Sequence, residues 1–396
     1  MQQILNLLAS LNNQANYRTL SPQQHKDVEI YLNQKWLLNL ASNDYLNLAS
    51  DKNLKESFLD SEIFRKNCFF SASSSRSLSG NFEIYAIFEE LLESLFNKKA
   101  LLFNSGYHAN IGVISRLNNL KNVLFLADKS IHASHIDGLK SFHKTHFKRF
   151  AHNDMQSLTH LLDKYHHHYE AIFILSEGLF SIEGDFAKLH SLIALKKHFK
   201  NVYLYLDEAH SIGSFGDNGL GLAQNLNCLE DIDFLILTFG KAIGSVGACV
   251  LCNQVFKEYF INTARSLIYS TALPPLNIAM SYFIFSKLPY FEENRKRLKA
   301  LSLNFKSSLE QLELFEILGD YNILSIILKE NQKALFFQQK LQEYGFFLPA
   351  IKPPTTAKNR ACLRISLCAN TPQEKLEIFI KNLIKINNEY LSEYKK

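Results

Sequence analysis

Short apolar runs alternate with amphipathic stretches between about residue 51 and residue 285. Several of these runs are continuously apolar, which is typical of strands in a parallel sheet that helices cover on both faces. The expected strands are residues 100–103, 123–127, 171–175, 202–206, 234–237 and 248–251. Helical periodicity fills segments between them, such as residues 82–96 and 186–198. The pattern predicts an α/β fold with a mostly parallel, doubly wound sheet, whose ligands bind beyond the carboxyl ends of the strands.

The two ends of the chain have a different pattern. Residues 1–38 are polar with spaced Leu and Ile residues, which predicts a helical arm followed by a loop, and residues 39–48 are expected to form a short strand and a turn. After residue 275 long helical patterns dominate, with strands expected at residues 323–328 and 362–366. We therefore expect three parts, because the chain is long for a single core. They are a large ligand-binding α/β domain (51–285), a smaller α+β domain (286–396) and an N-terminal segment (1–50) that packs with the smaller domain.

Composition and charge narrow the class of protein. Hydrophobic residues make up 47% of the chain and charged residues 20%, which argues against disorder. A formal net charge of +5 over 396 residues is too small to indicate nucleic-acid binding. The six cysteines are scattered, the first residues lack the pattern of a secretory leader, and no stretch is long and apolar enough to span a membrane. These features predict a cytoplasmic protein with reduced thiols.

Two charged residues mark the ends of predicted strands. Asp207 ends one strand and Lys241 follows the next one. A carboxylate and a lysine in these positions suit a cofactor with a basic ring nitrogen and an aldehyde, which describes pyridoxal 5′-phosphate (PLP). Ser105-Gly106-Tyr107 follows another predicted strand where a helix begins, so its backbone N–H groups are candidates for holding the phosphate, as is the hydroxyl of Thr238. Together these features predict a PLP site.

Each feature has a simpler explanation when it is taken alone. A lysine after a strand is usually a surface residue, and an aspartate there usually caps a helix. Other motifs are weaker still: the glycines at 216–221 have the reversed spacing of a dinucleotide fingerprint, and Gly240-Lys241 lacks the remaining residues of a phosphate-binding loop. Cys249 and Cys252 lie in an apolar strand without a second ligand pair, so we expect no metal site.

Two stretches resemble a known family. Residues 207–221, DEAHSIGSFGDNGLG, and residues 238–242, TFGKA, are similar to the signature and the PLP-lysine motif of the α-oxoamine synthases. The similarity extends from about residue 40 to residue 366. The resemblance implies a fold-type I PLP-dependent transferase that condenses an amino acid with an acyl thioester and releases CO₂ and free thiol. It also implies a homodimer whose subunits share their active sites.

Three further stretches distinguish branches of this family: residues 149–154 (RFAHND), 267–275 (LIYSTALPP) and 350–355 (AIKPPT). They are most similar to the branch that joins L-alanine to a pimeloyl thioester in biotin biosynthesis. Glycine C-acetyltransferase activity is the nearer alternative, and a non-catalytic PLP-fold binding protein is the other. Whether the pimeloyl group is carried by coenzyme A or by acyl carrier protein stays open. Arg149 and His152 in the first stretch are interpreted as structural and are left out of the predicted site.

The resemblance implies catalytic roles position by position. Lys241 is expected to form the Schiff base with PLP and to remove the α-proton of the amino acid. Asp207 is expected to pair with the pyridine nitrogen, and His132 to stack on the ring. Ser181 and His210 are expected to contact the phenolic oxygen of the ring.

The resemblance also implies which residues hold the phosphate. Gly106, Tyr107 and Thr238 are expected to bind it from the same subunit. Ser270 and Thr271 are expected to reach it from the partner subunit.

Three residues are expected to bind the substrates. Arg364 is expected to clamp the amino-acid carboxylate, for which a planar guanidinium fork is well suited. Arg18 and Thr355 are expected to face the acyl substrate. One stretch departs from the family pattern: residues 71–76 are SASSSR, where the family usually has Gly-Ser-Gly-Gly-Ser-Arg. We expect the backbone there to be less permissive near the thioester channel.

Overall fold

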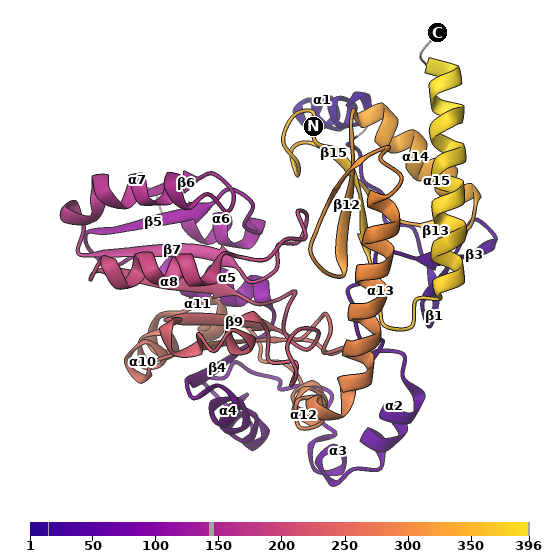
Figure 1. The fold of residues 1–396 in the computed structure, drawn as a ribbon. Coiled ribbons are helices and arrows are strands. Elements are labelled where there is room, and N and C mark those ends of the chain that lie inside the picture. Colours follow the sequence, from indigo (N-terminus) through magenta and orange to yellow (C-terminus); the bar gives the residue numbers. More distant parts are fainter. Residues whose placement is uncertain (15, 142–145, 395–396) are drawn as a thin grey trace.

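A seven-stranded sheet forms the centre of the larger part of the protein in the computed structural model, which describes residues 1–14, 16–141 and 146–394 (Figure 1). The strand order is β4-β10-β9-β8-β7-β5-β6. β10 runs antiparallel to both neighbours, and the other neighbouring pairs are parallel. The strands are β4 (Lys99–Phe103), β5 (Val123–Asp128), β6 (Phe147–Phe150), β7 (Ala171–Glu177), β8 (Val202–Asp207), β9 (Phe234–Thr238) and β10 (Ala248–Cys252).

All six strands expected in this sheet are present, so the predicted fold class is confirmed. Their continuous apolar runs are buried on both faces: every residue of β5 and of β10 is buried. The edge strand β6 was missed, because two of its four residues are exposed and charged and it has no apolar run to mark it.

Helices cover the two faces of this sheet. The helix expected at 186–198 begins later, at Leu189, because Phe186 pairs with Leu179 in an isolated bridge and closes a turn instead. The helices of this part are α4 (Glu83–Phe96), α5 (Gly106–Leu117), α6 (Ala133–Lys140), α7 (Met155–Tyr165), α8 (Leu189–His198), α9 (Leu222–Asn225), α10 (Gln254–Thr263), α11 (Arg265–Ile268) and α12 (Pro275–Phe285).

A second group of elements lies beside the large sheet (Figure 1). A four-stranded sheet has the order β11-β12-β15-β14. It is built from β11 (Glu316–Leu318), β12 (Ile323–Lys329), β14 (Ala350–Ile351) and β15 (Ala361–Ser366), with helices α13 (Glu292–Glu310), α14 (Asn331–Glu343) and α15 (Gln373–Tyr394) around it. Both strands expected here, at 323–328 and 362–366, are present.

The N-terminal region differs from the prediction. Helix α1 (Gln2–Asn13) is present, but the expected loop contains three strands, β1 (Gln24–Lys26), β2 (Glu29–Leu32) and β3 (Lys35–Asn39). β3 pairs in parallel with β13 (Phe346–Phe347), more than 300 residues away in the sequence. Short strands that depend on such a distant partner leave little local signal. Helices α2 (Lys52–Leu59) and α3 (Glu62–Asn67) lead into the large sheet.

None of the helices in the described parts of the chain is both long enough and apolar enough to cross a membrane.

Candidate active site

Three neighbouring parallel strands end in polar residues at one edge of the large sheet. Glu177 ends β7, Asp207 ends β8 and Thr238 ends β9. Glu177 and Asp207 are register partners, and both are buried. This edge is where the fold class predicts a ligand, because the strands' carboxyl ends meet there.

Lys241 lies on the tight connection between β9 and β10. The Phe239 N–H donates to the Gly247 carbonyl, and the Ser245 N–H donates to the Phe239 carbonyl, so the connection is folded back on itself. The Lys241 Nζ lies 2.8 Å from His210 Nε2. Burial lowers the pKa of Lys241 to about 8, although the Asp207 and Glu177 carboxylates act in the opposite direction.

His210 connects the lysine to a residue that sequence analysis missed. Its Nδ1 lies 2.6 Å from the hydroxyl of Tyr45, and that hydroxyl donates to Asn43 Oδ1 at 3.1 Å. Because the Tyr45 proton is used in this way, its oxygen accepts from the N–H at Nδ1 of His210. Nε2 then presents a lone pair to Lys241. Burial, together with the charges of Lys241 and Arg364, lowers the pKa of His210 well below its ordinary value, so the ring is neutral.

Asp207 is held by neutral donors. Asn110 Nδ2 donates to one carboxylate oxygen at 2.8 Å, and the Ala209 N–H donates to the other at 2.9 Å. Nε2 of the buried His135 lies 3.6 Å from the same carboxylate and has no hydrogen-bond partner among the described residues. Burial lowers the pKa of His135 to about 4, so this ring carries no charge. Among the described residues, the groups that donate hydrogen bonds to this carboxylate are therefore neutral, and none of them is a cation.

His132 is positioned through its backbone. It caps α6, its N–H donates to Glu177 Oε1 at 2.5 Å, and its Nδ1 lies 2.8 Å from Ser134 Oγ. The ring itself is exposed at the edge of the sheet. Burial and the charge of Asp207 raise the pKa of Glu177 well above its ordinary value. Glu177 was not predicted as a site residue, although it is the polar end of an otherwise apolar strand.

The predicted phosphate residues lie around the start of α5. Ser105 caps this helix, and Gly106 and Tyr107 are in its first turn, where backbone N–H groups have no partner within the helix. A Cβ atom on Gly106 would lie 2.4 Å from Thr238 Oγ1, so only glycine allows the helix this close to β9. The Tyr107 side chain points elsewhere: it is 46% exposed and donates to Asp137.

The segment with Ser270 and Thr271 lies beside this cradle in the same chain. Asn104 Nδ2 donates to Ser270 Oγ at 3.0 Å and to the Thr271 carbonyl at 2.7 Å. Asn104 directly precedes the phosphate-binding turn and was not predicted. The expected reach of Ser270 and Thr271 into a partner subunit stays a prediction.

Arg364 comes from β15, in the smaller sheet, and faces the same edge. It is buried, its Nε donates to the Ser181 carbonyl at 2.5 Å, and its Nη2 donates to Asn43 Oδ1 at 3.4 Å. Asn43 thus joins Arg364 to Tyr45, and through Tyr45 to His210 and the lysine. The structure brings Ser181, His210, Lys241 and Arg364 together, and their expected contacts with the cofactor and substrate stay predictions.

The two remaining substrate residues lie at the surface. Arg18 and Thr355 are both exposed. Their segments lie side by side, because Asn16 Nδ2 donates to the Pro353 carbonyl at 3.3 Å. Their contact with an acyl group stays a prediction.

One residue of the serine-rich stretch has a strained backbone conformation. Ser73 replaces a family glycine and has a φ of 55°, in the left-handed region where a side chain costs about 1 kcal/mol. Next to it, the Ser74 carbonyl accepts from the Ala272 N–H at 2.9 Å. The strained stretch therefore borders the segment that carries Ser270 and Thr271.

Glu208, the residue next to Asp207, has a structural role. It is fully buried and accepts hydrogen bonds from Ser211 Oγ and from the Leu222 and Ala223 N–H groups, which begin α9. Burial raises the pKa of Glu208. A Cβ atom on Gly221, whose φ is 90°, would lie 2.2 Å from this carboxylate, so glycine is required there.

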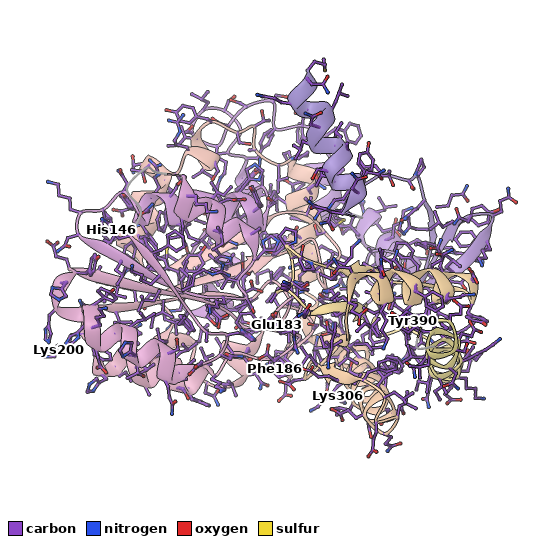
Figure 2. All side chains as sticks on the ribbon, turned by 90° about the horizontal axis from the view of Figure 1, so that it is seen from above. His146, Glu183, Phe186, Lys200, Lys306 and Tyr390 are labelled. Carbon is purple, nitrogen blue, oxygen red and sulfur yellow. The ribbon has the colours of Figure 1, made fainter. Side chains whose placement is uncertain are left out.

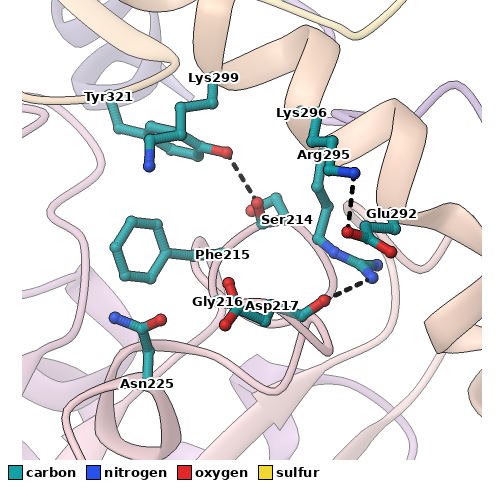
Figure 3. Close-up of a pocket in the computed structure, with 10 residues that line it drawn as sticks. All are labelled: Ser214, Phe215, Gly216, Asp217, Asn225, Glu292, Arg295, Lys296, Lys299 and Tyr321. Atoms are coloured by element: carbon teal, nitrogen blue, oxygen red, sulfur yellow. Dashed lines mark hydrogen bonds and ion pairs between the residues drawn. The ribbon is translucent and has the colours of Figure 1, made fainter.

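A separate cavity of about 310 Å³ lies between the loop after His210 and helix α13 (Figure 3). The buried Arg295 crosses it: Nη1 donates to the Leu288 carbonyl and Nη2 to the Asp217 carbonyl. Tyr321 donates to the Ser214 carbonyl. Arg295 ties the loop to α13, and Tyr321 ties it to the turn between β11 and β12; Lys241, Asp207 and His210 do not line the cavity.

The residues around Lys241 fit PLP. The buried Lys241, whose pKa is lowered, suits the aldehyde of PLP, and the Asp207 carboxylate, held by neutral donors, suits the ring nitrogen. The start of α5, where Gly106 leaves no room for a Cβ atom, suits the phosphate. The unpartnered Nε2 of His135 lies on the carboxylate side of the same site. Lys241 and Asp207 would hold the two ends of the ring, and Gly106 and Thr238 would surround the phosphate.

Comparisons with known proteins agree with this fit. A sequence model of the aminotransferase class I and II family matches residues 35–383. Serine palmitoyltransferase from S. paucimobilis, solved with a bound PLP–myriocin aldimine, superimposes with a TM-score of 0.87 at 25% identity, covering 98% of this chain and 97% of that one. The chain therefore belongs to the aminotransferase class I and II family, and its fold is that of the fold-type I PLP-dependent enzymes.

Closer relatives narrow the family to one group. The 8-amino-7-oxononanoate synthase of Haemophilus ducreyi is 44% identical over 375 residues, which is 93% of this chain and 96% of that protein. The solved 8-amino-7-oxononanoate synthase from Francisella tularensis is 31% identical, has a TM-score of 0.74 and covers 90% of this chain and 99% of that one. Within its family, the chain groups with the PLP-dependent 8-amino-7-oxononanoate synthases, in the α-oxoamine synthase branch predicted from the two motifs.

The lowered pKa of Lys241 predicts how the apoprotein captures PLP. Only the neutral amine is nucleophilic, so capture should slow about tenfold for each pH unit below about 8 and level off above it, whereas an ordinary lysine would show a rise to about pH 10. Stopped-flow absorbance after mixing apoprotein with PLP measures this rate. The rate at which PLP reacts with a free lysine derivative, measured over the same pH range, corrects for the titration of the cofactor itself. A capture rate that keeps rising to about pH 10 would contradict the prediction.

Proposed function

We propose that this protein catalyses the PLP-dependent condensation of L-alanine with a pimeloyl thioester, giving 8-amino-7-oxononanoate, CO₂ and free thiol in biotin biosynthesis. The observation that carries the proposal is the convergence of Lys241, Asp207, His210 and Arg364 on one edge of the sheet, in a chain 44% identical to a synthase of this kind.

The chain's own residues divide the work of this reaction. When bound, PLP supplies an electron-withdrawing ring that stabilises negative charge at the amino acid's Cα. Lys241 takes the α-proton, because a pKa of about 8 leaves a useful fraction of its amine neutral near physiological pH. The neutral His210 accepts a hydrogen bond from Nζ at Nε2 and orients it. Asp207 accepts hydrogen bonds from the Asn110 side chain and the Ala209 N–H, which hold the carboxylate in place for the ring nitrogen.

Arg364 binds the α-carboxylate in this proposal. Its guanidinium is held by the Ser181 carbonyl and by Asn43, so the fork is oriented before the amino acid arrives. Arg18 and Thr355 are proposed to contact the pimeloyl chain from the two neighbouring surface segments. His132 is proposed to cover one face of the ring, and Ser181 to contact its phenolic oxygen.

We further propose that the protein is a cytoplasmic homodimer in which Ser270 and Thr271 reach the partner's phosphate site. Exposed apolar side chains support this: Phe70 is 82% exposed, Leu78 is 80% exposed, and their segment bonds to the one that carries Thr271 through Ser74 and Ala272. The six cysteines are free, which suits a reducing compartment.

A substrate matrix tests the proposed reaction. Purified protein loaded with PLP is assayed with L-alanine, glycine and L-serine, each against pimeloyl, acetyl and long-chain acyl thioesters of coenzyme A. We expect the highest kcat/KM for L-alanine with the pimeloyl thioester. A higher kcat/KM for glycine with the acetyl thioester would show that the protein is a glycine C-acetyltransferase instead. Full PLP binding without turnover of any pair would show that it is a non-catalytic PLP-binding protein. The pimeloyl thioester of acyl carrier protein is assayed in parallel at several salt concentrations. A rate that falls with added salt for the carrier-protein thioester, but not for the coenzyme A thioester, would indicate an interface for the carrier protein.

A further inference from the structure

His152 stands at the centre of an ion cluster that the proposed reaction does not use. Its Nδ1 lies 2.9 Å from Asp128 Oδ1, and its Nε2 lies 3.0 and 3.1 Å from the two oxygens of Asp185. The ring packs edge-on against Phe180, with centroids 4.5 Å apart. Because both ring nitrogens face carboxylates, both must carry a proton to bond in this way. The ring therefore acts as a cationic bridge between Asp128 and Asp185.

The cluster joins the end of β5 to a turn formed by residues 179–186, which we call the Ser181 turn. Asp128 is the last residue of β5, and its second carboxylate oxygen accepts from the Asn153 N–H at 2.8 Å. The Asn153 side chain in turn donates to Asp185 Oδ2 and to the Phe186 carbonyl. His152 and Asn153 therefore hold one side of the Ser181 turn onto the large sheet.

The other side of the Ser181 turn bonds to the smaller sheet. The Ser181 carbonyl accepts from Arg364, the Ile182 carbonyl accepts from Ser325 Oγ at 2.6 Å, and the Gly184 carbonyl accepts from the Asp320 N–H at 2.8 Å. Figure 2 shows Glu183 and Phe186 where the large α/β part meets the C-terminal elements. The Ser181 turn thus connects the large sheet to the Arg364 guanidinium and helps to set its position.

We propose that His152 is a positioning residue for amino-acid binding: it fixes the Ser181 turn so that the Ser181 carbonyl holds the Arg364 guanidinium toward the substrate carboxylate. The inference rests on the proposed role of Arg364. The role also accounts for the presence of a histidine in the RFAHND stretch. Among the described residues, this histidine makes its hydrogen bonds and ion pairs with Asp128 and Asp185, and none with Lys241 or Asp207.

The charge state of His152 agrees with this role. Burial lowers the pKa of the ring, but hydrogen bonds to Asp128 and Asp185 outweigh that effect and raise the pKa to about 10. The bridge is therefore charged and intact at every pH near neutrality.

A double-mutant cycle separates positioning from general destabilisation. The variants are His152→Gln, Arg364→Ala and the combination, with His168→Asn, an exposed histidine on the surface of the same part, as the matched control. The dissociation constant of L-alanine is measured from the spectral change of the PLP-loaded protein. Hydrogen–deuterium exchange of the 179–186 peptide is measured on the apoprotein, which gives a readout that does not involve activity.

We expect His152→Gln to raise the dissociation constant about 10-fold and Arg364→Ala about 100-fold, with the double variant within about twofold of Arg364→Ala alone. Exchange of the 179–186 peptide should accelerate about tenfold in His152→Gln, the KM for the pimeloyl thioester should stay within about twofold, and His168→Asn should match the parent protein. Effects that multiply in the double variant, or unchanged alanine binding in His152→Gln, would overturn the proposal.

Two additions keep the test decisive. If His152→Gln does not fold, Asp185→Asn replaces it, because that change weakens the bridge only on the turn side, and it should raise the dissociation constant about threefold. If the parent protein binds glycine or L-serine instead of L-alanine, the cycle is run with that amino acid, since the carboxylate is common to all three. The cycle measures amino-acid binding rather than turnover, so failure of the proposed reaction can be distinguished from failure of the positioning role. A parent protein that binds none of the three amino acids would contradict both proposals.

Discussion

A Lys241→Ala variant is expected to condense L-alanine with a pimeloyl thioester about 10⁴-fold more slowly than the parent protein. The change removes the amine that lies 2.8 Å from His210 Nε2, and with it both the cofactor attachment and the base that takes the α-proton. The expected loss is in kcat, measured under saturating PLP and both substrates, with thiol release as the readout.

The control for this variant is Lys200→Ala, a lysine on the surface of the large α/β part (Figure 2). It should retain the parent rate and the parent absorbance of bound PLP. The Lys241→Ala protein should lose the visible absorbance band of attached cofactor while keeping its thermal midpoint, because alanine leaves the β9–β10 connection intact. Turnover by Lys241→Ala at the parent rate would remove the central residue of the proposed mechanism.

An Asp207→Asn variant is expected to lower kcat about 10³-fold and to lower the thermal midpoint as well. An amide has no charge with which to hold a proton on the ring nitrogen, and removal of one preorganised electrostatic contact costs a factor of this order. The amide oxygen can still accept from the Ala209 N–H, but the amide NH₂ would then face the Asn110 Nδ2 donor, which costs about 1–3 kcal/mol of stability. Steady-state kinetics and thermal unfolding on the same preparation measure the two effects.

Glu208→Gln is the matched comparison, because Glu208 is the neighbouring carboxylate and is equally buried. Its oxygens accept from Leu222 and Ala223, so an amide NH₂ there would face an N–H donor and cost about 1–3 kcal/mol of stability. We expect a lower thermal midpoint with a kcat within about tenfold of the parent value. A larger kcat loss in Glu208→Gln than in Asp207→Asn would reverse the assigned roles.

Six of the seven strands of the large sheet were predictable because they are buried on both faces and therefore apolar along most of their length. The ends of those strands were equally visible, since Asp207 and Lys241 interrupt apolar runs. β6 and β1–β3 gave no such signal: they are short or partly exposed, and β3 is completed by a strand from the opposite end of the chain. Pairing over such distances leaves no periodicity in either segment.

Two of the missed site residues, Tyr45 and Asn110, act on residues far away in the sequence. Tyr45 bonds to His210, 165 positions later, and Asn110 bonds to Asp207, 97 positions later. Alone, a tyrosine in a turn or an asparagine in a helix is unremarkable. Glu177 differs, because its place at the end of an apolar strand is the same signal that identified Asp207.

The contact between Arg364 and Asn43 spans 321 positions, whereas Lys241 lies within a hairpin that closes over fewer than ten residues. Loop closure costs more entropy as the intervening chain lengthens, and distant contacts form late in folding. The hairpin around the lysine can therefore form early and locally, while the carboxylate clamp waits for the two ends of the chain to meet. On this argument, the loop that carries Lys241 takes its shape before the arginine that binds the substrate carboxylate is in place.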